Sequence, residues 1–104
     1  MLESMDQAVG TMITALEERG VLDNTLLVFF NDNGGRKSNP PFRGGKGDTL
    51  EGGVRVPCIF HWPENVPANQ SVDGIMHVVD LYPTLLGIGG GSLKQKLPFD
   101  GVDM

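Results

Sequence analysis

Asp32 and Asn33 are the two residues whose types and position best suit metal chemistry. They follow the apolar run 25–30 directly and precede Gly34 and Gly35. In open α/β sheets, ligands bind beyond the carboxyl ends of the strands. A carboxylate beside a carboxamide offers hard oxygen ligands, which suit calcium or magnesium better than zinc. The alternative is an Asx turn without a metal, since Asp-Asn-Gly is common turn chemistry. Two ligands would also leave a calcium shell of about six to eight oxygens incomplete.

The Gly-rich stretch 34–53 forms a second candidate site, because positive charge gathers there in an acidic chain. The formal net charge is −5, yet five of the eight Lys and Arg residues fall between positions 34 and 55: Arg36, Lys37, Arg43, Lys46 and Arg55. Glycine lets backbone N–H groups approach an anion closely, and Lys or Arg supplies charge. The loop is therefore a candidate anion site, and the alternative is a solvated, flexible loop. It is not a P-loop, because Gly47 stands where Ser or Thr would bind magnesium.

The first half of the chain contains the elements that must position these residues. Apolar residues recur at helical spacing between Leu2 and Leu16, which predicts an amphipathic helix that Gly20 stops. The run Thr25–Phe30 does not alternate, so it predicts a strand covered on both faces, as in a parallel α/β sheet. Residues 34–53 show neither helical nor strand periodicity.

The second half predicts three further elements. Residues 54–62 return to apolar character and predict a second strand, in which Pro57 favours an edge or early position. Residues 75–79 predict a short third strand. Asp80 then suits the N-cap of a helix that runs through Leu85 and Leu86 and tolerates Pro83 in its first turn. The tail after residue 91 is weakly patterned.

Composition excludes several classes of function. A net charge of −5 argues against binding to nucleic acid or to an anionic membrane surface. No apolar run approaches the ~20 residues of a membrane span. The start of the chain shows no signal peptide, so by itself the chain is expected to be cytoplasmic. The single Cys58 excludes an internal disulfide and is expected to be a small apolar strand residue.

Four ordered blocks carry a resemblance to the sulfatase family, and together they span essentially the whole chain. The segment 23–35 (DNTLLVFFNDNGG) resembles the sulfatase segment that ends in a calcium-binding Asp-Asn pair. RGGKG at 43–47 followed by EGGVRVP at 51–57 is similar to the second sulfatase signature. DLYPTLL at 80–86 and DGVD at 100–103 also occur in that family, in this order.

The resemblance implies roles for individual residues. Asp32 and Asn33 would be calcium ligands, Lys46 would contact the substrate sulfate, and Arg43 would join it in substrate binding. Arg55 and the flanking glycines would shape the loop. Related zinc-dependent phosphoesterases generally have His after the Asp, so Asn33 favours the calcium-dependent sulfatases over that alternative.

The family nucleophile has no counterpart in these residues. It is a formylglycine made in a Cys/Ser-x-Pro-x-Arg motif, which the 104 residues do not contain, and Cys58 does not fit it. Neither His61 nor His77 matches a catalytic histidine of the family, so both are expected to be structural or exposed.

The combined expectation is an α/β chain: one partial domain, 1–104, from the later part of a sulfatase catalytic domain of the alkaline-phosphatase-like class. It would have two to three strands, two main helices and the loop 34–53. Such a sulfatase fragment would be inactive alone, and its partners would be a sulfate ester or another small anion. Its unpaired sheet would lead to self-association or to pairing with a missing N-terminal half. The alternative is a free-standing module that binds anions or another protein.

Overall fold

The computed structural model describes all residues 1–104, which form an α/β chain of two compact units, Met1–Gln70 and Ser71–Met104. The first unit holds α1 (Leu2–Glu18), β1 (Leu27–Phe30), α2 (Glu51–Val54) and β2 (Cys58–His61). The second holds a 3₁₀ turn, η1 (Val78–Asp80), and α3 (Leu81–Ile88). The two main helices, the α/β class and two strands are as predicted. The assignment of the chain to a single partial domain stays a prediction.

Helix α1 forms where the apolar spacing predicts it. Arg19 is its C-cap, and Gly20 follows at φ +65°, the left-handed conformation that glycine adopts at little cost. The N–H groups of Gly20 and Val21 donate back to the carbonyls of Glu17 and Leu16 and so close the helix end. The apolar stripe of α1 contains no buried residue, so the helix has no covering partner in these residues.

Strands β1 and β2 form an antiparallel ribbon, with Phe29 opposite Ile59 and Phe30 opposite Cys58. The expectation of a strand within a parallel sheet, covered on both faces, is not met within this chain: Phe29 and Phe30 remain 40% and 39% exposed. Pro57 immediately precedes β2, the early position expected of it. Strand β2 is shorter than the predicted 54–62, because Val54 ends α2 and the strand itself begins only at Cys58.

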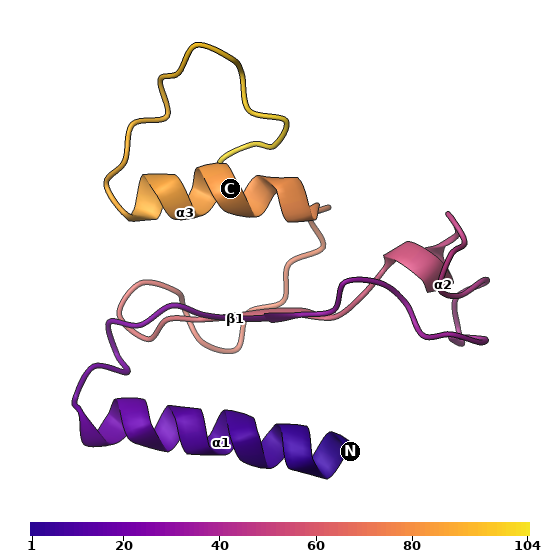
Figure 1. The fold of residues 1–104 in the computed structure, drawn as a ribbon, viewed down its shortest axis with the longest axis horizontal. Helices are drawn as coiled ribbons and strands as arrows, with labels where there is room; N and C mark the ends of the chain where they lie inside the picture. The colour runs from indigo at the N-terminus through magenta and orange to yellow at the C-terminus, as the bar shows by residue number, and fades with distance from the viewer. The chain divides into compact units, whose positions relative to one another are not determined.

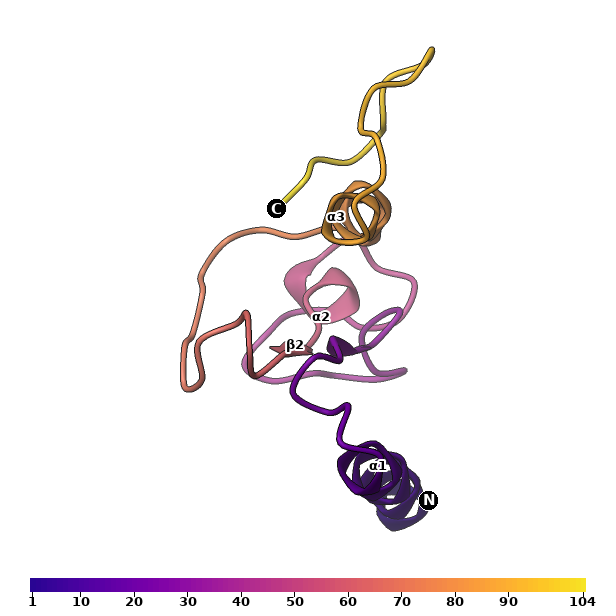
Figure 2. The same cartoon turned by 90° about the vertical axis from the view of Figure 1, so that its left-hand side faces the viewer.

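The loop 34–53 folds back on itself at the end of the ribbon, and its last residues form α2 (Figure 1, Figure 2). The absence of regular structure predicted for this stretch is therefore wrong at its end. The backbone N–H of Gly34 donates to Gly53 O at 2.9 Å, and that of Gly52 donates to Arg43 O at 2.8 Å. The first bond joins the two ends of the loop to each other, and the second joins its end to its middle.

In the second unit, no strand forms at residues 75–79, and this prediction is wrong. The segment stays extended to His77 and then turns into η1, because the Asp80 carboxylate accepts the His77 N–H and His77 Nδ1 accepts the Val79 N–H. Helix α3 begins directly afterwards and tolerates Pro83 in its first turn, as predicted.

The chain buries no hydrophobic side chain beyond Pro83, so neither unit has a core of its own. The buried residues of the first unit are glycines of the loop, Gly34, Gly45, Gly52 and Gly53. Backbone packing in the loop, and not a cluster of apolar side chains, is the tightest part of that unit. None of the helices is both long and apolar enough for a membrane crossing.

Candidate functional site

Asp32 and Asn33 lie just beyond the end of β1, where the sequence predicts a site. Asp32 is exposed, and its carboxylate takes part in no salt bridge and no side-chain hydrogen bond. The Asn33 Nδ2 donates to Gly34 O at 2.8 Å, which uses the amine side of the carboxamide. The Asp32 carboxylate and Asn33 Oδ1 are therefore not engaged by other side chains, and both are hard oxygen donors.

These donors fit calcium chemically but do not complete a calcium site. No group of three or more His, Cys, Asp or Glu residues gathers anywhere in the chain. Calcium usually takes about six to eight oxygens, so most of the shell would have to come from other groups.

The loop brings Lys46 against the segment that follows the Asp-Asn pair. The backbone N–H of Lys46 donates to Gly35 O at 2.8 Å, two residues beyond Asn33. One hydrogen bond thereby joins position 46 to Gly35, which is distant from it in sequence and follows the Asp-Asn pair. Both predicted parts of the site lie at the same end of the ribbon.

Lys46 and Arg43 have exposed side chains, and neither forms an ion pair. Asp48 is the nearest acidic residue along the chain, but its Oδ2 accepts the Gly45 N–H at 2.9 Å. The Asp48 carboxylate therefore binds the loop backbone and does not pair with Lys46 or Arg43. Both cations remain available to an external anion, as a sulfate contact requires.

Glycines permit the close approach of the loop segments. A Cβ on Gly34 would overlap the Gly52 carbonyl, and a Cβ on Gly45 would overlap the Lys37 carbonyl. Gly52 and Gly53 have the same restriction against the backbone of residues 43–48. These glycines thus allow one layer of loop backbone to pack on another.

Arg55 contacts two residues of the loop, Phe42 and Glu51. Its guanidinium carbon lies 4.9 Å from the centre of the Phe42 ring, a cation–π distance. It also pairs with Glu51 across one turn at 3.4 Å, but both side chains are 61% exposed, so this pair stabilises little. The resemblance implied that Arg55 shapes the loop, and the stacking on Phe42 agrees with that role.

Asn39 belongs to no motif in the sequence, yet its half-buried carboxamide Nδ2 donates to the loop backbone. Its four acceptors are the carbonyls of Gly35, Lys37, Gly44 and Gly52. These carbonyls lie four, two, five and thirteen residues away in sequence. No periodicity connects such partners. The only available signal was a short carboxamide inside a glycine loop.

Asp80 begins α3 as predicted, but its carboxylate does not cap that helix. The two carboxylate oxygens instead accept the N–H groups of His77 at 2.8 Å and Val102 at 2.9 Å. These two hydrogen bonds, first that from His77, lower the pKa of Asp80 below its ordinary value of 3.8. The blocks 80–86 and 100–103 are joined by this contact.

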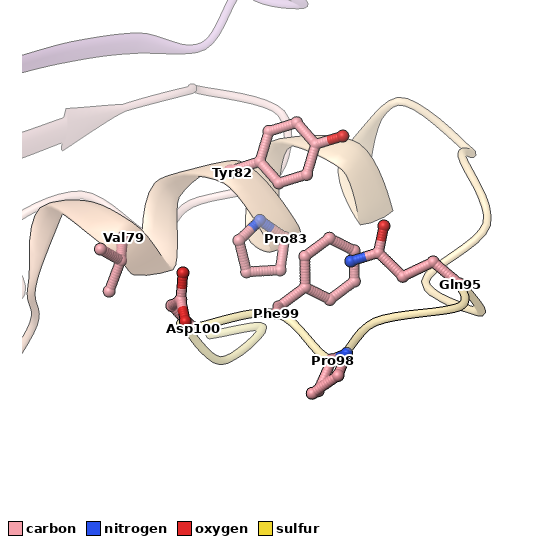
Figure 3. Close-up of a pocket in the computed structure, with 7 residues that line it drawn as sticks. All are labelled: Val79, Tyr82, Pro83, Gln95, Pro98, Phe99 and Asp100. Atoms are coloured by element: carbon pink, nitrogen blue, oxygen red, sulfur yellow. The ribbon is translucent and has the colours of Figure 1, made fainter.

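An open pocket in the second unit lies beside α3 (Figure 3). Phe99 lies next to Pro83 there, and its ring centre is 5.5 Å from that of Tyr82. The only charged residue in the lining is Asp100. An acidic, mostly apolar lining does not suit a sulfate group.

Cys58, His61 and His77 do not form a reactive group. Cys58 and His61 occupy the two ends of β2, opposite Phe30 and Leu27. Burial raises the pKa of the Cys58 thiol, which disfavours the reactive thiolate. His77 serves as a cap of η1. The expectation that the two histidines are structural or exposed agrees with these positions.

Comparison with known proteins identifies the family. A protein-family model described as Sulfatase matches residues 1–91. The chain belongs to the sulfatase family. Among solved structures, PsFucS1 sulfatase from Pseudoalteromonas sp. superimposes with a TM-score of 0.86 and 39% sequence identity. The superposition covers 97% of this chain and 22% of that one. The α/β fold is thus part of the alkaline-phosphatase-like fold of sulfatases, as the resemblance implied.

Curated relatives show the same relationship. Arylsulfatase H of Homo sapiens is 37% identical over 115 residues, which cover 99% of this chain and 20% of the relative. Steryl-sulfatase of Mus musculus is 36% identical, with 99% and 18% coverage. The chain therefore spans about a fifth of the length of the sulfatases it matches. It corresponds to one portion of a sulfatase catalytic domain.

Proposed function

We propose that this chain supplies the charge-stabilising part of a sulfatase active site, for hydrolysis of a sulfuric ester. Asp32 and Asn33 would hold calcium, Lys46 would contact the sulfate group and Arg43 would assist it. The observation that carries this proposal is the hydrogen bond from Lys46 N–H to Gly35 O, which ties the cationic loop to the segment after the Asp-Asn pair.

The proposed chemistry is electrostatic. A sulfate ester carries negative charge on its oxygens, and charge develops on the leaving oxygen when the S–O bond breaks. A fixed ammonium group stabilises such charge without reorganising during the reaction. When bound, calcium would add Lewis-acid stabilisation of the sulfate oxygens. The 104 residues include no Cys/Ser-x-Pro-x-Arg nucleophile motif, so the chain alone is expected not to turn over a sulfate ester.

The remaining calcium ligands and the nucleophile would come from the rest of a sulfatase fold. The exposed apolar faces support this proposal, because Phe29 and Ile59 pair across the ribbon and are 40% and 57% exposed. The Trp62 ring N–H is buried and has no hydrogen-bond partner in the chain. Buried donors are nearly always paired, so a group outside these residues is expected to accept it.

Sulfate titration of the full chain tests the role of Lys46. In NMR spectra of ¹⁵N-labelled protein, inorganic sulfate should shift the amide signals of Gly44 to Gly47. Lys46→Ala should weaken sulfate binding by about fivefold, the scale of one exposed charge interaction of about 1 kcal/mol. Binding weakens because the variant lacks the Lys46 ammonium group that is proposed to contact sulfate.

Lys37→Ala is the matched control, because it removes the same charge from the same exposed loop. It should change sulfate affinity by less than Lys46→Ala does. Equal losses in the two variants would show that sulfate responds only to the net charge of the loop. That result would contradict a specific sulfate contact at Lys46.

A further inference from the structure

The Asn39 side chain is the point at which the separate turns of the loop meet. Its Nδ2 lies 2.9 Å from Gly52 O and 3.0 Å from Gly35 O. Two further carbonyl oxygens are at longer range, Lys37 O at 3.2 Å and Gly44 O at 3.4 Å. All four neighbours are acceptors, which fixes the amine side of the carboxamide toward the loop interior.

A carboxamide has two donor hydrogens, so the two shorter contacts take most of the hydrogen bonding. They go to opposite walls of the loop, since Gly35 belongs to the segment after Asn33 and Gly52 belongs to α2. The longer contacts share the same protons weakly. Asn39 therefore acts as a tie between the start and the end of the loop.

This tie reaches Lys46 through a shared acceptor. Gly35 O accepts both the Asn39 Nδ2–H and the Lys46 N–H, at 3.0 Å and 2.8 Å. The position of the Lys46 backbone thus depends on where the Gly35 carbonyl is held. On the other side of the loop, the Asn39 Nδ2 donates to Gly52 O, and the N–H of Gly52 donates to Arg43 O. Both cations proposed to contact sulfate are one hydrogen bond away from a group that Asn39 binds.

Glycine is needed at positions 35 and 45 for the loop to pack closely around the Asn39 side chain and the Gly35 carbonyl. A Cβ on Gly35 would lie 2.5 Å from Asn39 Oδ1, and a Cβ on Gly45 would lie 2.8 Å from Gly35 O. No second side chain bonds these carbonyls. Loss of the Asn39 amide would leave them without a side-chain donor.

We infer that Asn39 is the positioning residue of the sulfate-binding loop, holding Lys46 at a fixed place relative to the Asp32–Asn33 pair through the shared Gly35 carbonyl. The inference rests on the proposed function of Lys46 for its consequence, but the tie itself is independent of any ligand.

Asn39→Leu tests the tie, because leucine keeps the branched shape and the neutral charge but removes both donors. In the full chain, hydrogen exchange of the Lys46 amide should become about tenfold faster, the effect of losing roughly one net hydrogen bond. Amides of α1 and of the β ribbon should exchange as in the wild type. Asn24→Leu is the control, since Asn24 is exposed and its side chain makes no hydrogen bond. An unchanged Lys46 exchange rate in Asn39→Leu would overturn the inference.

The unmodified protein gives a second measurement, which holds even if Asn39→Leu does not fold. The side-chain amide protons of Asn39 should exchange at least about tenfold more slowly than those of Asn24, because only the former are hydrogen-bonded. Equal exchange of the two carboxamides would overturn the tie.

A double-variant cycle with sulfate separates positioning from a general structural effect. Asn39→Leu should weaken sulfate binding about as much as Lys46→Ala, and the double variant should lose no more than either single one. Additive losses would show that Asn39 does not act through Lys46 and would overturn the inference. If the wild type binds no sulfate but the exchange results hold, the proposed function fails and the tie between Asn39 and Lys46 stands.

Discussion

At the scale of single residues, short polar side chains organise this chain by binding backbone. Asn39 and Asp80 each join segments that are distant in sequence, one with donors and one with acceptors. In a chain without an apolar core, these hydrogen bonds fix the loops that carry the sulfatase blocks.

Asp80 makes the second unit sensitive to acid. Because its folded pKa is lowered, its contribution to stability is present above the ordinary value of 3.8 and is lost as the pH falls through the lower folded pKa. The amide signals of His77 and Val102 should therefore shift together below about pH 4 in an NMR titration. Asp80→Asn should abolish this shift and weaken the Val102 contact, because only one carboxamide oxygen can accept.

Asp73→Asn is the control for that titration, since Asp73 is exposed in the same unit and makes no hydrogen bond. It should leave the response of Val102 unchanged. A response of Val102 that persists in Asp80→Asn would show that another group titrates there.

At the scale of elements, glycine weakens helix α1 at one position and terminates it favourably at another. Gly10 lies inside α1 with open space where a Cβ would be, whereas Gly20 ends that helix at φ +65°. Gly10→Ala should stabilise α1 by about 0.5–1 kcal/mol, because alanine loses less backbone entropy. Gly20→Ala should destabilise the helix end by about 1–2 kcal/mol, because the left-handed conformation crowds a Cβ.

Circular dichroism during thermal unfolding measures the stability of the two variants, Gly10→Ala and Gly20→Ala. Helical signal and midpoint should rise in Gly10→Ala and fall in Gly20→Ala. Each variant is the other's control, since both add one methyl group to the same element. A fall in both would mean that α1 packs through Gly10 against a surface that these residues do not contain.

The elements also show where prediction from sequence succeeds. Helices α1 and α3 have regular apolar spacing, and their ends have strong local signals, Gly20 and Asp80. Helix α2 was missed because Gly52 and Gly53 are poor helix formers, and tertiary packing of their bare backbone outweighs that propensity. The strand expected at residues 75–79 failed because Asp80 draws the chain into a 3₁₀ turn. Asp32, Asn33 and Lys46 could be proposed as site residues from a motif, whereas the hydrogen bonds of Asn39 connect positions that no local sequence pattern links.

At the scale of the whole molecule, the absence of a hydrophobic core is the dominant fact. Phe29 and Ile59 lie directly opposite each other on one face of a ribbon of only two strands, both edges of which are open. Open edges and apolar faces associate with other chains. The proposed occupant of this face is the rest of a sulfatase fold, and in its absence a second copy of the chain.

Light scattering coupled to size exclusion tests this proposal. At high concentration the chain should have a mass above that of one 11.2 kDa molecule. Phe29→Lys should reduce the association, because it puts a charge on the apolar face. Val72→Lys, a similar change at a residue that is 84% exposed and outside the ribbon, should not. A single-chain mass at every concentration would contradict the proposal.

The Gly34 N–H bond to Gly53 O has a consequence for the chemical ageing of the site. Asn followed by Gly loses its side-chain amide when the next backbone nitrogen attacks the carboxamide carbon, and Asn33 has that neighbour. In the closed loop, the Gly34 nitrogen is held by Gly53 and is not free to attack. Asn39 is followed by Pro40, whose nitrogen carries no hydrogen, so the same route is closed there. While the loop stays closed, Asn33 is therefore expected to resist deamidation and to keep the carboxamide that is proposed as a calcium ligand.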